Sequence, residues 1–173
     1  MLLLKRAAVL VFLAALGGCG FEPLHGRVAG GSSTSVELAQ VRIEIIRDRN
    51  GQVLRNFLLD RFSPRGVSRD PQWSLEVRVN ESITSLGVQK TSEATRANLL
   101  MTGSFVLVPI DGEEEPLSGS IKAVSSFDIQ RSDFGTLSAE KDARTRALRQ
   151  IAEDLTARIS VYFRLVLERG SAS

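Results

Sequence analysis

Residues 73–80 read WSLEVRVN and alternate strictly between apolar and polar side chains. The apolar parity holds Trp73, Leu75, Val77 and Val79, and the polar parity holds Ser74, Glu76, Arg78 and Asn80. A period of two predicts a β-strand with one buried side and one side in water. The neighbouring segments must therefore supply a second layer that covers the apolar side.

Two more strands are predicted directly after this one. Residues 99–109 form an apolar run, and Ile121, Ala123, Phe127 and Ile129 share one parity. The polar stretch 84–95, centred on Gly87, and the acidic stretch 111–116 are interpreted as turns. Because the connections are short, the three strands are expected to form an antiparallel meander.

One strand and one helix are predicted before the meander. Residues 41–46, VRIEII, alternate as a strand does. After Asn50-Gly51, apolar residues recur at helical spacing as far as Phe62. The helix should end at Ser63-Pro64, because a proline disfavours helical geometry in the residue before it.

A long helix is predicted over residues 138–169. Ser138 is expected to cap it, with Glu140 and Asp142 in the first turn, where carboxylates interact favourably with the helix dipole. One apolar stripe runs along it, and such a stripe normally faces the core. Its members are Leu148, Ile151, Leu155, Ile159, Tyr162 and Val166.

These elements define an α+β fold, a two-layer sandwich. Two amphipathic helices should pack on one face of a four-stranded, mostly antiparallel sheet. We expect one domain over residues 36–170, and a chain of 173 residues is long enough to give it a core.

The N-terminus predicts export. Residues 1–18 have the layout of a signal peptide, with Lys5 and Arg6 ahead of ten apolar residues, 7–16. Ten helical residues reach roughly 15 Å, about half the thickness of a bilayer core. The sequence Leu16-Gly17-Gly18-Cys19 resembles the bacterial lipobox, in which the cysteine receives a diacylglycerol and, after cleavage before it, an N-acyl chain. The alternative is an ordinary signal peptide with an incidental cysteine.

Acylation of Cys19 implies a firm membrane anchor, because stable attachment needs two or more lipid signals. Gly20 follows the cysteine, and by resemblance to bacterial sorting rules this favours the outer membrane. Residues 19–35 would form the lipidated N-terminus and a flexible tether. Cleavage removes Lys5 and Arg6, so the 22 basic side chains fall to 20 and equal the 20 acidic ones.

The sequence indicates no enzyme. His25, the sole histidine, lies in the predicted tether, and no cluster has the spacing of metal ligands or of a catalytic triad. We therefore expect no catalytic residues, no metal, and no cofactor beyond the acyl chains. Neutral charge and the inward parity of Trp73 also speak against nucleic-acid binding.

Residues 19–26, CGFEPLHG, resemble the start of the mature chain in the LptE family of lipopolysaccharide-assembly lipoproteins. The expected element order, the strand end at 106–109 and the segment 139–142, AEKD, are similar as well. The resemblance implies two helices on a four-stranded sheet. It also implies a place inside the LptD outer-membrane barrel, on the periplasmic side and in the lumen, and a part in carrying lipopolysaccharide to the outer leaflet.

The same resemblance implies basic residues that bind the phosphates of lipopolysaccharide. The matching positions are Lys141, and Lys90 or Arg96 ahead of the third strand. The alternative for each is an ordinary exposed side chain. Lys141 near a helix N-terminus would be unfavourable for the helix dipole, which adds interest to that position.

Two other functions stay open from the sequence. One is a periplasm-facing regulatory lipoprotein of a cell-wall synthase, although the tether is short for that reach. The other is a lipid-binding subunit of a transport system, for which a sizeable apolar cavity would be needed.

Overall fold

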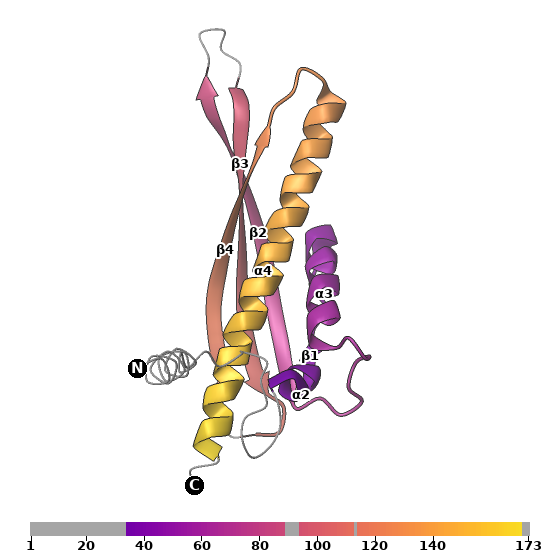
Figure 1. The fold of residues 1–173 in the computed structure, drawn as a ribbon, viewed down its shortest axis with the longest axis vertical. Coiled ribbons are helices and arrows are strands. Elements are labelled where there is room, and N and C mark those ends of the chain that lie inside the picture. Colours follow the sequence, from indigo (N-terminus) through magenta and orange to yellow (C-terminus); the bar gives the residue numbers. More distant parts are fainter. Residues whose placement is uncertain (1–33, 89–93, 113, 171–173) are drawn as a thin grey trace, which may run out of the picture.

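The computed structural model describes residues 34–88, 94–112 and 114–170 (Figure 1). The predicted signal peptide, Cys19, His25 and most of the predicted tether lie outside these ranges. The elements are, in chain order, α2 (Thr34–Ala39), β1 (Val41–Ile43), α3 (Asp48–Phe62), β2 (Trp73–Val88), β3 (Ala94–Pro109), β4 (Leu117–Asp128) and α4 (Asp133–Gly170). No helix within the described ranges is both long enough and apolar enough to cross a bilayer.

The sheet has the strand order β1-β2-β3-β4. Strands β2, β3 and β4 form the predicted antiparallel meander, in which Trp73 pairs with Pro109 and Leu107 with Leu117. Strand β1 lies parallel to β2, with Val41 opposite Trp73. The mostly antiparallel sheet predicted from the sequence is therefore confirmed.

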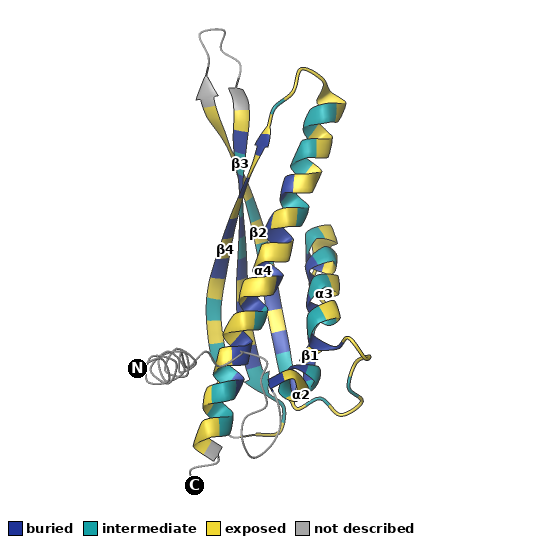
Figure 2. Cartoon of the chain, viewed as in Figure 1, coloured by how far each residue is buried: buried dark blue, intermediate teal, exposed yellow. Residues whose placement is uncertain are grey.

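Both long helices cover one face of this sheet (Figure 1). Helix α4 runs along β3 and β4, and α3 lies beside α4. The alternating residues of the strands and the apolar stripe of α4 meet between the layers, where Leu148, Ile151, Leu155 and Ile159 are buried (Figure 2). A close approach at one point favours a glycine, because a Cβ at Gly103 would lie 3.1 Å from the Cγ2 atom of Ile151. The predicted two-layer α+β sandwich is confirmed.

The turn predicted over residues 84–95 is wrong. Strand β2 continues to Val88 and β3 begins at Ala94, and the ladder holds up to the pair Val88 and Ala94. This part of the hairpin reaches past α3, and Thr84 and Ser85 are exposed, so polar residues are tolerated on both of its sides. A strand with both sides in water can carry polar residues on both, so it lacks the alternation of apolar and polar residues that identifies a half-buried strand.

The predicted start of the last helix is also wrong. Helix α4 begins at Asp133, and Ser138 lies inside it. The capping side chain belongs to Ser132, whose hydroxyl oxygen accepts a hydrogen bond from the backbone N–H of Gly135 at 3.4 Å. Serine at this position caps a helix by accepting such a bond. Lys141 therefore lies two turns into the helix, and the argument from an unfavourable dipole no longer holds.

The first strand is shorter and the first long helix begins earlier than predicted. Strand β1 ends at Ile43, and α3 starts at Asp48 and includes Asn50 and Gly51. Gly51 serves close packing here, because a Cβ would lie 2.5 Å from the Cγ2 atom of Ile46. The short helix α2 was not predicted, and it begins at Thr34, just ahead of the expected domain start at residue 36.

Candidate functional site

The candidate site lies at the end of the molecule where the β2–β3 hairpin and the first turns of α4 project past α3 (Figure 1). Two of the three basic residues proposed from the sequence are described there, Arg96 on β3 and Lys141 on α4. Lys90 lies outside the described residues.

Arg96 lies on the open face of the sheet. Its neighbour Ala97 is buried under the helices, so the alternation of the strand turns Arg96 to the opposite side. Its guanidinium group donates a hydrogen bond from Nε to Oδ1 of Asp128, the residue opposite it on β4, at 3.2 Å. Arg96 and Lys141 therefore share one end of the molecule but lie on different sides of the sheet.

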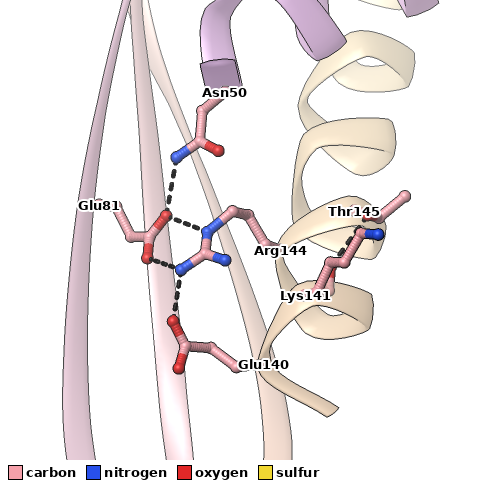
Figure 3. Close-up of polar contacts among 6 residues, drawn as sticks. All are labelled: Asn50, Glu81, Glu140, Lys141, Arg144 and Thr145. Carbon is pink, nitrogen blue, oxygen red and sulfur yellow. Dashed lines mark hydrogen bonds and ion pairs between the residues drawn. The ribbon is translucent and has the colours of Figure 1, made fainter. Parts of the chain in front are cut away.

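Lys141 is exposed on α4. Its backbone carbonyl accepts a hydrogen bond from the Thr145 hydroxyl at 2.9 Å, and its side chain points away from the neighbouring Glu140 and Arg144 (Figure 3). Among the described residues, no carboxylate forms an ion pair with Lys141. Its ammonium group is therefore free to meet an anion from outside.

Arg144 lies on the opposite side of α4 from Lys141. It belongs to a hydrogen-bonded cluster that connects α4, β2 and α3 (Figure 3). Its Nε and Nη2 atoms donate to the two carboxylate oxygens of Glu81 on β2, each at 2.7 Å, and Nη2 also donates to Glu140 at 2.5 Å. Asn50 of α3 donates to Glu81 at 2.9 Å. The bidentate geometry is the strong form of an arginine–carboxylate contact.

The electrostatics keep this cluster charged. Hydrogen bonds from Arg144 are the largest cause that holds the pKa of Glu81 below its ordinary value, and partial burial opposes them. In turn, the hydrogen bond to Glu81 raises the pKa of Arg144. Both groups stay ionised near neutral pH, so their ion pair helps to fix the position of α4 on the sheet.

The sequence carried two signals for this cluster that were missed. Glu81 continues the buried parity of Trp73, Leu75, Val77 and Val79, where a carboxylate needs a partner. Glu140 and Arg144 have the i, i+4 spacing of a helical ion pair.

Replacing Arg144 with methionine should lower the free energy of unfolding by about 2 kcal/mol, because it leaves Glu81 partly buried without its main partner. The measurement is urea unfolding of the full chain followed by circular dichroism. The double variant Glu81→Leu/Arg144→Met should recover most of the loss, since it removes both charges. Lys141→Met on the same turn is the matched control and should change stability by less than about 0.5 kcal/mol.

The same experiment has a defined pH dependence. The pKa of Glu81 is lowered from about 4.5, so its contribution is fully present above that value and is lost as pH falls through the lower folded-state pKa. The stability difference between the natural chain and Arg144→Met should therefore shrink as pH falls from 6 to 3. A difference that stays constant over this range would contradict the assignment.

No metal centre is formed within the described ranges, where no three His, Cys, Asp or Glu side chains are placed to share an ion.

Solved structures share this fold. A candidate lipoprotein from Caulobacter crescentus superposes with a TM-score of 0.61 at 17% identity, over 76% of this chain and 95% of that one. The rare lipoprotein B of Shewanella oneidensis gives 0.54 at 12%, over 74% and 98%. Lipoprotein B of Nitrosomonas europaea gives 0.57 at 11%, over 75% and 86%. The architecture is thus that of a class of small α+β domains found in bacterial lipoproteins.

The family follows from the sequence. The model of the LptE family, described as lipopolysaccharide-assembly, matches residues 38–159. The chain therefore belongs to the LptE family. None of the curated proteins matches the chain significantly.

Proposed function

We propose that this protein is an outer-membrane lipoprotein that occupies the lumen of an LptD barrel and assists the transport of lipopolysaccharide to the outer leaflet. The observation that carries the proposal is the match to the LptE family over residues 38–159, which spans the sheet and most of α4. The proposal includes acylation of Cys19 as the membrane anchor.

The surface of the domain supports a plug in a water-lined barrel. Most side chains on the open face of the sheet are hydroxyl, amide or charged groups, which suit a polar lumen, and Leu86, Val106 and Val124 are exposed apolar side chains on the same face. Its members on the three long strands include Glu76, Arg78, Asn80, Ser82, Thr102, Ser104, Ser120, Lys122 and Ser126. A face turned to lipid would need an apolar band instead.

Lys141 is the better of the two described candidates for contact with lipopolysaccharide phosphates. Its ammonium group is exposed and has no carboxylate partner among the described residues. Arg96 already donates to Asp128, so an anion would have to compete for its guanidinium group.

The lipid-carrier alternative finds no support in the described interior. It needs an apolar cavity, whereas the space between sheet and helices is filled by large buried side chains such as Phe62, Leu107, Ile151 and Phe163. Two surface grooves are open and carry charged residues, among them Glu44, Asp48 and Arg78 in one and Glu114, Glu115 and Arg169 in the other.

The test is an affinity purification of the tagged full-length protein from detergent-solubilised outer membranes, with partners identified by mass spectrometry. We expect LptD in near-equal amount. Recovery of a cell-wall synthase or a transporter subunit in place of LptD would reject the proposal.

A further inference from the structure

The first turn of α4 displays two large apolar side chains to solvent. Phe134 is 82% exposed and Leu137 is 62% exposed, while the core-facing residues further along the helix are almost completely buried. Exposed apolar side chains that lie together indicate a binding surface. These two residues have no part in the core or in the Arg144 cluster.

Phe134, Leu137 and Lys141 follow one another at i, i+3 and i+7, the spacing that places side chains on one side of a helix. We call these three residues the outer stripe. It spans roughly 10 Å along the helix axis at 1.5 Å per residue. Along the helix, two apolar side chains are followed by one ammonium group. This order is complementary to an amphiphile, in which apolar acyl chains are followed by an anionic headgroup.

The turn that carries the outer stripe is held in place. The hydroxyl oxygen of Thr136 accepts a hydrogen bond from the backbone N–H of Gln130 at 2.9 Å, and Ser132 caps the helix. Helix α3 does not cover the stripe, because α4 extends well past the end of α3 (Figure 1). The exposure thus belongs to an ordered surface.

We infer that the outer stripe binds the acyl chains of an amphiphile whose anionic headgroup meets Lys141. The inference rests on the proposed function, which supplies lipopolysaccharide as that amphiphile and Lys141 as a phosphate contact. The acyl-chain contact by Phe134 and Leu137 is the added content.

The size of the surface favours a lipid over a protein. A stable protein interface buries about 800 Å² on each partner around a well-packed apolar centre. Two apolar side chains on one helix turn form too small a centre for that, but they are enough to cover part of an acyl chain. The hairpin at the same end adds one partly exposed apolar residue on the helix-covered face of the sheet, Ile83 at 43%.

The experiment places a photoreactive phenylalanine analogue at one position at a time in the full-length protein, expressed in cells. The test positions are 134 and 137. The matched controls are Val161 and Leu165, which are apolar, 47% and 48% exposed, and near the opposite end of the same helix. After irradiation, the adducts are identified by immunoblotting with antibodies to lipopolysaccharide and to LptD.

We expect lipopolysaccharide adducts from positions 134 and 137 and not from 161 and 165. Adducts to LptD in place of lipopolysaccharide, equal lipopolysaccharide adducts from the controls, or no adducts at the test positions would each overturn the inference. LptD is purified with each variant, so failure of the proposed function is seen separately as the absence of LptD from every sample.

A second measurement uses Phe134→Ser/Leu137→Ser with Val161→Ser/Leu165→Ser as its control. Lipopolysaccharide that co-purifies with the first variant should fall about tenfold or more, because two large side chains lose their apolar contact. LptD recovery should stay unchanged in both variants. An equal fall in the control, or no fall in the test variant, would contradict acyl-chain binding at the outer stripe.

Discussion

Replacing Phe163 with alanine should lower the free energy of unfolding by about 3–5 kcal/mol. Phe163 lies on α4 and is only 1% exposed. Its ring centroid lies 5.2 Å from that of Trp73 on β2 and 5.8 Å from that of Tyr162. Truncation removes the transfer free energy of the ring and leaves a cavity between helix and sheet, and both terms are destabilising. Aromatic contacts of this kind add further stability beyond buried area.

Urea unfolding of the full chain, followed by circular dichroism, measures this effect. Two neighbours on the same helix turn provide controls. Val161→Ala should change stability by less than about 0.5 kcal/mol, because Val161 is 47% exposed. Tyr162→Phe should cost about 1 kcal/mol, because the hydroxyl donates a hydrogen bond to the carbonyl of Glu115 at 2.6 Å. A loss below 1 kcal/mol for Phe163→Ala would show that α4 does not pack on β2 as described.

The sheet and the long helices could be predicted because their residues are buried on one side only. The alternation at residues 73–80 and the apolar stripe of α4 both record that asymmetry. Phe163 itself lay outside the predicted stripe, because the helix turns its buried side gradually as it crosses the twisted sheet. The far end of the β2–β3 hairpin and the first turn of α4 were not predicted. Few of their residues are buried, so their sequences lack a one-sided apolar pattern.

The candidate site was harder to predict, since it depends on residues distant in the sequence. Lys141 and Arg144 are close along the chain, but only the fold shows that Arg144 forms an ion pair with Glu81 and that Lys141 points away from this pair. Arg96, the alternative to Lys90, was a candidate in the sequence as Lys141 was, yet the pairing of β3 with β4 places Asp128 opposite Arg96. Phe134 was excluded by the prediction that the helix begins at Ser138.

Replacing Cys19 with alanine should abolish the acyl anchor that we propose for the outer membrane. In the proposed processing, diacylglycerol is attached to the Cys19 thiol and cleavage then occurs before that residue. The alanine variant has no thiol to acylate, so it should keep residues 1–18 and carry no acyl chains. A single acyl chain gives only weak, reversible membrane binding, whereas two or more give a stable anchor. The loss of all acyl chains therefore predicts complete loss of anchoring in the outer membrane.

Intact-mass measurement and separation of inner and outer membranes on a density gradient check this result. His25→Ala is the matched control, because it changes a residue close to Cys19 and leaves the sequence 16–19 intact. It should show the acylated mass and the outer-membrane position of the natural protein. A natural protein with a free Cys19 thiol would instead establish an ordinary signal peptide, and the domain would then have to reach the barrel without an anchor. The family assignment would survive that outcome, because the matched residues 38–159 begin well after the cysteine.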